Sequence, residues 1–496
     1  MDIDKNIGKI LRGDLQYIQE YIKQNSRKIN EANSWGLTYL MIACRLGNID
    51  LINFLIDNGA DLNMEDGDSK TASHYAVFAH RCDVVDLMVS KGANINSGDH
   101  FGNTPLHCAV EKNCEDVVKV ILKTRVKEMN KANNNGGTPL HLACIKGHKH
   151  IVGHLLKCSP DVNLGDITGF TPLHEVCNEG NAEIVQLLLK LPNIDVNRAD
   201  KDGNSPLHYA AYRGHIDTVP LLLQQPRINL NMVNITGNTP LHMAVQKQHY
   251  NVVALMLSQG NVEMNMKNSD KLTPLLQAIS GGHFGMIHNL LSHGADINAV
   301  DNNDNNCLHL AVRKEAFHSE DESLGGILDE YCTKLELSLE DKLSGLVVAE
   351  YLAYHGANFY HENKQNQTPM ELIENAGLRE KMQTFFPPPL PCKWCEENKP
   401  TITFRPCGHV VLCEECCSKI PLKRCPECLL SITGKYGVDG SQCDAESIYT
   451  CTICMEQRWN MVFECGHTTC KECGNQLDRC HLCRKRIERK IIIKQC

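Results

Sequence analysis

The sequence predicts a mostly α-helical protein, in which a long array of repeated helical units is followed by two small cysteine-rich fingers. A tetrapeptide related to Thr-Pro-Leu-His recurs every 33 or 34 residues between positions 38 and 309. Of the 26 cysteines, 17 lie between Cys392 and Cys496, where most of them fall in closely spaced pairs. A fixed period of this length indicates a repeat array, and clustered cysteines indicate bound metal or disulfides.

Nine repeated units share one register, and each begins with a residue that can cap a helix: Thr38, Thr71, Thr104, Thr138, Thr171, Ser205, Thr239, Thr273 and Asn306. Thr and Ser accept N–H bonds at a helix start, and the Pro that often follows fits the first helical position. A glycine follows the first helix in several units, where a left-handed residue ends a helix at the lowest cost. These glycines are Gly47, Gly147, Gly180 and Gly214.

The 33-residue period with its Thr-Pro-Leu-His-x-Ala motif resembles the ankyrin repeat. The resemblance implies an α-solenoid, whose units bury their apolar faces only by stacking on one another. We assign residues 35–386 to nine repeats and a closing unit, and residues 1–34 to an N-terminal capping unit. An insertion at about 314–343 interrupts the ninth repeat. We expect it to be a mobile loop, because it includes the acidic segment HSEDES at 318–323.

Histidines and cysteines within the array are expected to be structural. The histidines occur once per repeat, too far apart in sequence to form a local metal cluster: His107, His141, His174, His208 and His242. Three cysteines occupy one position of the first helix, which is typical of small core residues: Cys44, Cys144 and Cys177.

The C-terminal cysteines form two sets of eight ligands, each in the order three Cys, one His, four Cys. The first set is Cys392, Cys395, Cys407, His409, Cys413, Cys416, Cys425 and Cys428. The second set is Cys451, Cys454, Cys465, His467, Cys470, Cys473, Cys480 and Cys483. Each set suffices for two tetrahedral zinc ions with no open coordination position, so we expect about four structural zinc ions per chain.

Two other uses of these cysteines are disfavoured. The chain opens without an apolar signal segment, so we expect a reducing, cytoplasmic location, where disulfides are rare. A histidine in the fourth ligand position resembles the RING finger, and this resemblance implies cross-braced zinc sites. A ligase with a catalytic cysteine needs a further zinc domain between its fingers, and residues 429–450 are too few to supply one. We assign 392–428 and 451–496 to two RING fingers, 387–391 to a Pro-rich spacer and 429–450 to a linker.

An ankyrin array followed by two C-terminal RING fingers resembles the mind bomb family of ubiquitin ligases. The segment CTICMEQRWNMVFECGHTTCKECGNQLDRCHLCRKRIERKIII, residues 451–493, carries the resemblance best. It implies a RING-type E3 ubiquitin-protein ligase, which positions a ubiquitin-charged conjugating enzyme and has no nucleophile of its own. The family's Mib-Herc2, ZZ and mind bomb repeat modules have no counterpart here, so its Notch-ligand substrate is not carried over.

The same resemblance implies roles for particular residues. Ile453 and Leu477 fall on the groove that binds the conjugating enzyme, and Arg484 falls on the linchpin position directly after the last zinc ligand. The first finger has Leu429 at the linchpin position and is expected to be the weaker one. The tail KIIIK at 490–494 has a β pattern, which suggests a homodimer through the second finger and the tail.

Charge and hydropathy restrict the partners to proteins. Residues 391–496 carry a net charge of +3 and the remainder −12, which disfavours binding to nucleic acid. No apolar run approaches the roughly 20 residues of a membrane-spanning helix. A protein substrate is expected on the ankyrin surface, at apolar or aromatic hairpin tips. The candidates are His100, Phe101, Ile167 and Ile235.

Two alternatives to a ligase stay open at this point. In the first, the chain is a non-catalytic ankyrin scaffold whose RING fingers serve assembly or dimerisation. In the second, which the acidic array disfavours, the fingers bind nucleic acid.

Overall fold

The computed structural model describes residues 2–123, 129–319 and 324–387, together with six short strands between Ile402 and Ile492. The chain divides into two compact units, residues 1–269 and 270–496. Within the described part of the chain, no helix is both long and apolar enough to cross a lipid bilayer.

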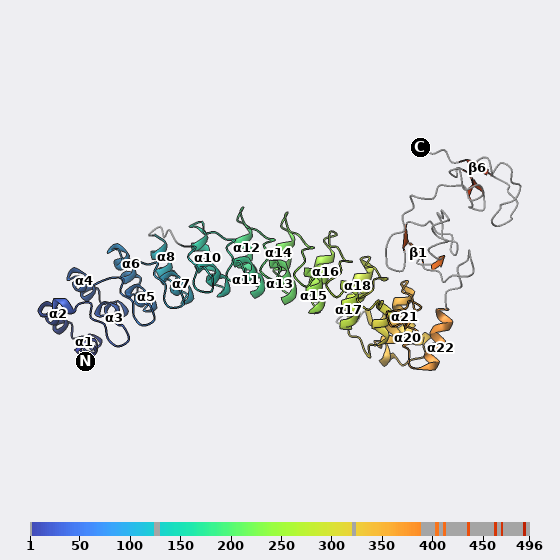
Figure 1. Ribbon diagram of the computed structural model, residues 1–496, viewed down its shortest axis with the longest axis horizontal. Helices are drawn as coiled ribbons and strands as arrows, with labels where there is room; N and C mark the ends of the chain where they lie inside the picture. The colour runs from blue at the N-terminus through green and yellow to red at the C-terminus, as the bar shows by residue number, and fades with distance from the viewer. Residues whose placement is uncertain are drawn as a thin grey trace. The chain divides into compact units, whose positions relative to one another are not determined.

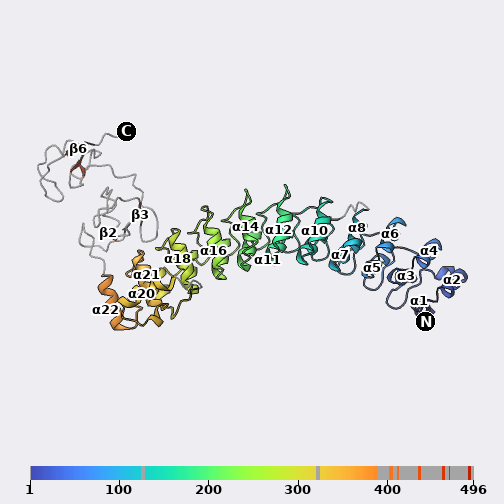
Figure 2. The ribbon, with the colours of Figure 1, turned by 180° about the vertical axis from the view of Figure 1, so that it is seen from behind.

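The first unit consists of helix pairs that follow one another side by side, from α3 and α4 to α15 and α16 (Figures 1 and 2). Its helices are α1 (Asp2–Leu11), α2 (Leu15–Gln24), the 3-10 helix η1 (Ser26–Lys28), α3 (Tyr39–Leu46), α4 (Ile49–Asp57), α5 (Ala72–Phe78), α6 (Cys82–Ser90), α7 (Pro105–Glu111), α8 (Glu115–Lys123), α9 (Pro139–Ile145), α10 (Lys149–Leu156), α11 (Pro172–Glu179), α12 (Ala182–Leu189), α13 (Pro206–Arg213), α14 (Val219–Leu223), α15 (Pro240–Gln246) and α16 (Tyr250–Leu257). This arrangement confirms the predicted helical repeat array.

The N-terminal segment contains one helix more than the sequence pattern suggested. The expected second-helix pattern forms α2, in which Ile18 and Ile22 are fully buried. Ahead of it, α1 packs against α3, and the side-chain amide of Asn6 donates to the hydroxyl oxygen of Tyr39 at 3.0 Å. The segment therefore covers the apolar end of the first repeat with two helices.

Each first helix begins at a buried cap that links one repeat to the next. In the third repeat, the backbone N–H of Thr104 donates to Nδ1 of His107 at 3.2 Å. Nε2 of the same ring lies 3.0 Å from the carbonyl oxygen of Gly137 in the following repeat. Because a carbonyl oxygen only accepts, Nε2 carries the proton and Nδ1 is the acceptor. The same bridge is formed by His74, His141, His174 and His208.

Glycine ends the first helix where the sequence predicted it. Gly47, Gly147, Gly180 and Gly214 all have positive φ angles, between 69° and 76°. At Gly180 a close approach adds to this requirement, because a Cβ atom there would lie 2.4 Å from Nδ1 of His215. That histidine donates from Nε2 to the carbonyl oxygen of Asn178 at 2.8 Å, so it cannot move away without losing a hydrogen bond.

The second unit contains the interrupted repeat. Its helices are α17 (Pro274–Gly281), α18 (Phe284–Ser292), α19 (Cys307–Val312), α20 (Gly325–Lys334), the 3-10 helix η3 (Leu339–Asp341), α21 (Gly345–Tyr354) and α22 (Ala376–Phe385). The ninth repeat is built from α19 and α21, and the insertion lies between them. In the expected closing unit, turns at 369–372 stand where a first helix would begin, and α22 follows.

The expectation that the insertion is a mobile loop is wrong for the part that the structure describes. Helix α20 packs against α21 and buries Leu328 and Cys332 completely. The ring of Tyr331 lies 5.8 Å from that of Tyr351, and the N–H of Phe317 donates to Leu343 O at 2.7 Å, which closes the base of the insertion. The insertion therefore adds a helix to the core of the ninth repeat.

Acid is predicted to weaken the array through its bridging histidines. Burial lowers the pKa of His107 and His208 to about 4. A lowered histidine pKa gives stability above the unfolded value of about 6.5, and this stability is lost as the pH falls toward 4. The expected loss is up to about 1.4 kcal/mol per pH unit for each such histidine. Urea unfolding followed by helical circular dichroism at pH 7 and pH 5 measures it.

A matched variant tests the origin of this pH dependence. The side chain of Gln offers a donor and an acceptor but does not titrate, so His208→Gln should show a smaller pH dependence than the wild type. Equal pH dependence in both proteins would contradict the role given to this histidine.

A second prediction concerns Gly180 and uses Gly153 as its control. Gly180→Ala should destabilise the array by about 1–3 kcal/mol, because a left-handed residue with a Cβ is strained and the methyl group meets His215. Gly153 lies inside α10 with nothing within 4 Å of an added Cβ. Gly153→Ala should therefore be neutral or stabilise by up to about 1 kcal/mol. Thermal unfolding of both variants checks the pair, and equal midpoints would contradict it.

Candidate functional site: the hairpin tips and the cysteine-rich fingers

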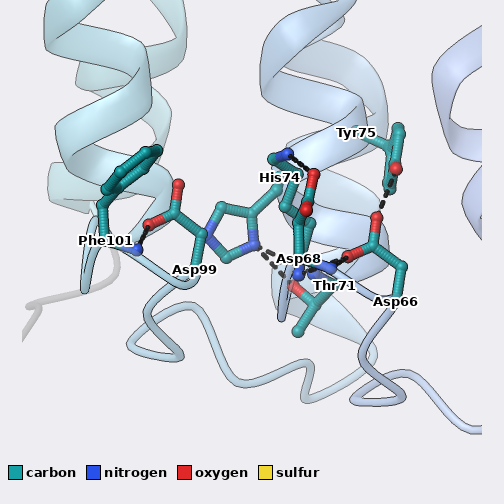
Figure 3. A network of polar contacts seen from close by, with 8 residues as sticks. Asp66, Asp68, Thr71, His74, Tyr75, Asp99 and Phe101 are labelled. Atoms are coloured by element: carbon teal, nitrogen blue, oxygen red, sulfur yellow. Dashed lines mark hydrogen bonds and ion pairs between the residues drawn. The ribbon is translucent and has the colours of Figure 1, made fainter. Parts of the chain in front are cut away.

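The hairpin tip of each repeat is built around one Asp or Asn. Figure 3 shows two neighbouring tips, which begin at Asp66 and Asp99. Oδ1 of Asp66 accepts from the backbone N–H groups of Asp68 and Lys70, at 2.9 and 2.8 Å. Oδ1 of Asp99 accepts in the same way from Phe101, at 3.0 Å, and from the residue two positions further on. The backbone of the tip is therefore held by a short acidic or amide side chain.

Backbone hydrogen bonds join each tip to the next. The N–H of His100 donates to Asp68 O at 2.9 Å, and the N–H of Ile167 donates to Asn135 O at 3.1 Å. The N–H of Ile235 donates to the carbonyl oxygen of Asp202 at 2.9 Å. These bonds use the backbone of His100, Ile167 and Ile235, so the side chains of these residues can differ between repeats. Some other tip side chains do join neighbouring tips, since the side-chain amide of Asn134 donates to His100 O at 3.0 Å.

The four tip residues singled out from the sequence are exposed. Phe101, Ile167 and Ile235 expose 60%, 55% and 70% of their surface, and His100 is also exposed. The rings of His100 and Phe101 lie 3.6 Å apart. Apolar groups with this exposure on a rigid backbone fit a contact with another protein. Their part in substrate binding stays a prediction.

Sequence reasoning missed a fifth exposed residue of this kind, Trp35. It exposes 68% of its surface, and its carbonyl oxygen accepts from the N–H of Gly67 in the next tip at 2.8 Å. Trp35 stands two positions after Asn33, as Phe101 stands two positions after Asp99. Counting from the first tip residue would therefore have found it.

Two tips carry a hydrogen bond from the adjacent first helix. The hydroxyl of Tyr75 donates to Oδ2 of Asp66 at 2.5 Å (Figure 3), and that of Tyr209 donates to Oδ2 of Asp200 at 2.6 Å. Burial, with the neighbouring carboxylate, raises the pKa of both tyrosines well above its usual value. Both hydroxyls therefore stay protonated and satisfy the outer oxygen of the tip carboxylate.

The cysteine-rich region contains two sheets with the same strand order. In the first, β1 (Ile402–Arg405) pairs antiparallel with β2 (Val410–Leu412) and β3 (Gly434–Tyr436), in the order β2-β1-β3. In the second, β4 (Met461–Phe463) pairs antiparallel with β5 (Thr468–Thr469) and β6 (Lys490–Ile492), in the order β5-β4-β6. The second ligand pair of each finger falls in sequence between the first two strands of its sheet.

Strand β3 corrects the expected boundary of the first finger. Residues 429–450 were expected to be a linker, but Gly434–Tyr436 pairs with β1 and so belongs to the sheet of the first finger. The β pattern of the C-terminal tail does form a strand, β6, which pairs with β4 of the same chain. All sixteen predicted zinc ligands, together with Ile453, Leu477 and Arg484, lie outside the described residues. The donor set itself, cysteine thiolates with one imidazole per finger, fits tetrahedral zinc.

Comparison with known families identifies both parts of the chain. A model of ankyrin repeats in three copies matches residues 9–99, 123–200, 150–234, 173–268 and 260–320, more than half of the chain, and a single ankyrin repeat matches 101–134. The chain belongs to the ankyrin-repeat family. A model of the C3HC4-type zinc finger, or RING finger, matches residues 389–435 and 447–490. The chain is therefore an ankyrin-repeat protein with two RING fingers, and these imply zinc binding.

Several relatives are named as E3 ubiquitin-protein ligases. MIB2 of Gallus gallus is 26% identical over 265 residues, which cover 40% of this chain and 28% of that protein. Mind-bomb of Drosophila melanogaster is 46% identical over 43 residues, 9% of this chain and 4% of that protein. RGLG3 of Arabidopsis thaliana is 47% identical over 45 residues, 9% of this chain and 12% of that protein. Each match covers less than a third of the relative's own length.

Proposed function

We propose that the chain is a RING-type E3 ubiquitin-protein ligase whose ankyrin array recruits a protein substrate. The observation that carries this proposal is the presence of two complete C3HC4 ligand sets, each inside a match to the RING finger. The matched relatives named as E3 ubiquitin-protein ligases support it. The partners are a ubiquitin-charged conjugating enzyme at the fingers and a substrate at the hairpin tips.

Zinc in these fingers has a structural role in the proposal. In the first finger, Cys392, Cys395, Cys413 and Cys416 hold one ion, and Cys407, His409, Cys425 and Cys428 hold the other. In the second finger, the two sets are Cys451, Cys454, Cys470 and Cys473, and Cys465, His467, Cys480 and Cys483. Four-ligand sites leave no position for water, so the metal supplies shape and no hydrolytic chemistry.

Ubiquitin transfer depends on how the second finger positions the charged conjugating enzyme. Ile453 and Leu477 contact the conjugating enzyme through apolar surface, and Arg484 bridges that enzyme and its ubiquitin. A guanidinium group has five donors in a rigid fork, which suits a bridge between two proteins. Leu429 has no donor at the same place of the first finger, so the second finger carries the activity. A homodimer through the second finger and the tail is part of the same proposal, and β6 lies at the edge of its sheet.

Zinc removal should affect the fingers and leave the ankyrin array unchanged. Metal analysis of the full chain should find about four zinc ions. Chelation should abolish ubiquitin transfer and leave the helical signal of the array intact, because zinc binding supplies the folding energy of the fingers and stacking supplies that of the array. Two or fewer ions per chain would remove at least one finger from the proposal.

Arg484→Ala tests the linchpin directly. It should lower the rate of ubiquitin discharge from the conjugating enzyme by about tenfold, or about 1.4 kcal/mol, with unchanged zinc content. Leu429→Ala is the matched control in the first finger and should change the rate little. Ile453→Ala should instead weaken binding of the conjugating enzyme, because it removes apolar contact area. A normal rate for Arg484→Ala would reject the linchpin, and a wild type inactive with every conjugating enzyme would favour a scaffold.

Substrate recruitment is tested at the tips. Replacing Phe101, Ile167 and Ile235 together with serine should lower the recovery of proximity-labelled partners by at least about tenfold. Each of these side chains contributes about 1.5–3 kcal/mol to binding when the partner buries it. Folding should be unaffected, because the tip ladder uses backbone atoms. Ile216→Ser, at a side chain that is 45% exposed and outside the tips, is the control. Equal partner recovery from the triple variant and the control would place the substrate elsewhere.

A further inference from the structure

The ninth repeat buries a carboxylate at the contact between its inserted helix and the rest of the repeat. Glu350 lies in α21 and is 0% exposed, and neither oxygen of its carboxylate has a hydrogen-bond partner among the described residues. A buried polar group without a partner is costly, and a buried charge without one is costlier still. Stability alone therefore does not explain an acid at this position.

The carboxylate faces α20, the helix that the insertion adds. Glu350 and Tyr354 lie four residues apart in α21, so they share one face of this helix. The ring of Tyr331 in α20 lies 5.4 Å from the ring of Tyr354 and 5.8 Å from that of Tyr351. The two helices lie side by side in both views of the molecule (Figures 1 and 2). Helix α20 therefore covers the face of α21 that carries Glu350.

Packing against the repeat holds α20 in place. The helix has ten residues and begins with two glycines, which disfavour a helix on its own. Directly after it, Glu336 has a φ angle of 56°, so the chain turns sharply there. The buried side chains of α20 are Leu328, Cys332 and Leu335. Because these contacts supply its stability, α20 depends on what lies beneath it.

Glu350 has no cation of its own to balance a charge. The nearby ammonium group of Lys334 on α20 pairs with Oε1 of Glu330 at 2.7 Å and lies 4.7 Å from the centre of the Tyr354 ring. Burial raises the pKa of Glu350 to about 7, and the charge of Lys334 offsets only part of this rise. The carboxyl group therefore changes its charge close to neutral pH.

We propose that α20 is a pH-sensitive flap, which closes over Glu350 when this side chain is protonated and loosens when it ionises. Ionisation brings a charge without a partner into the contact between α20 and α21, and opening lets water solvate it. Opening also uncovers the apolar side chains of Leu328 and Leu335. This inference goes beyond ubiquitin transfer and does not rest on it.

The direction of the pH effect follows from the pKa of Glu350 in the two states. With the flap open, the pKa is the ordinary one of about 4.3, and with the flap closed it is about 7. The closed form therefore binds the proton more tightly. Closure is strongest in acid, weakens as the pH rises from about 4.3 to 7, and then levels off. The opening equilibrium should increase by about tenfold between pH 6 and pH 8.

Other titratable groups lie on the helices that pack around α21. Burial raises the pKa of four of them, which stay protonated in this range: Tyr331, Cys332, Tyr351 and Cys307. Burial lowers the pKa of His309 in α19 to about 4, so this ring stays neutral. The remaining groups are Asp329, Glu330 and Lys334 of α20, Asp341 of η3, His288 of α18, and His355. A variant that changes only Glu350 keeps all of them.

Hydrogen exchange of the zinc-loaded full-length chain tests the flap. Exchange of the peptide that covers α20 is measured by mass spectrometry at pH 6 and pH 8, for the wild type and for Glu350→Gln. Dividing the wild-type rate by the variant rate at the same pH removes the pH dependence of the exchange chemistry itself. This ratio should be about tenfold larger at pH 8 than at pH 6 for α20, and unchanged for α19.

Two further variants serve as controls. Glu330→Gln removes an acid of α20 whose side chain is 73% exposed, so it should keep the pH dependence of the wild type. Glu350→Leu removes the charge and leaves no buried polar atom, so it should protect α20 at both pH values at least as well as Glu350→Gln does. Glu350→Leu replaces Glu350→Gln as the reference if the amide disturbs the packing.

The thiol of Cys332 gives a chemical readout of the same opening. It is fully buried and donates to Ser338 O at 2.9 Å, so a maleimide reaches it only when α20 opens. The ratio of its alkylation rate in the wild type to that in Glu350→Gln should also rise about tenfold from pH 6 to pH 8. Cys307 in α19 is equally buried and should show no such rise.

Two results would overturn the proposal. Equal ratios at pH 6 and pH 8 in both readouts would mean that α20 opens independently of Glu350. An equal rise in α19 and at Cys307 would mean that the whole repeat unfolds and that α20 is no separate flap. Neither measurement involves ubiquitin or a conjugating enzyme, so failure of the flap and failure of the proposed ligase activity are distinguishable.

Discussion

The ankyrin array depends on one buried contact, in which an imidazole ring joins the helix cap of one repeat to the hairpin of the next. His107 is typical: Nδ1 accepts from the N–H of Thr104, and Nε2 donates to the carbonyl oxygen of Gly137. A neutral histidine offers an acceptor and a donor on opposite sides of one rigid ring. The bridge therefore sets the start of a helix and the place of the following hairpin at once, and the tip ladder builds on that hairpin.

Because backbone atoms and the first residue of each tip hold the hairpins, recognition can vary without loss of the fold. Ile167 and Lys201 stand at the same place in successive repeats, and each donates its N–H to the tip before it, at 3.1 and 2.9 Å. One side chain is apolar and the other is charged, yet the backbone is the same.

Where the sequence predicted structure poorly, the stabilising partner lay elsewhere in the chain. The 33-residue period and the cap residues predicted the repeats, because those features act within a few residues of each other. Helix α20 was missed because it begins with two glycines and follows an acidic segment, and its stability comes from burying Leu328 and Cys332 against α21. Strand β3 was missed for the same reason, since its three residues are held by pairing with β1.

The sequence by itself determined the repeat register, the starts of the first helices, the ligand order of both fingers and the class of protein, because each is set by local chemistry or by spacing along the chain. Only the tertiary structure decided which side chains meet across repeats. It showed that Nε2 of each bridging histidine reaches the next hairpin and that Trp35 joins the exposed tips. These features arise from stacking residues about 33 positions apart, and the burial that changes their chemistry exists only in the folded array.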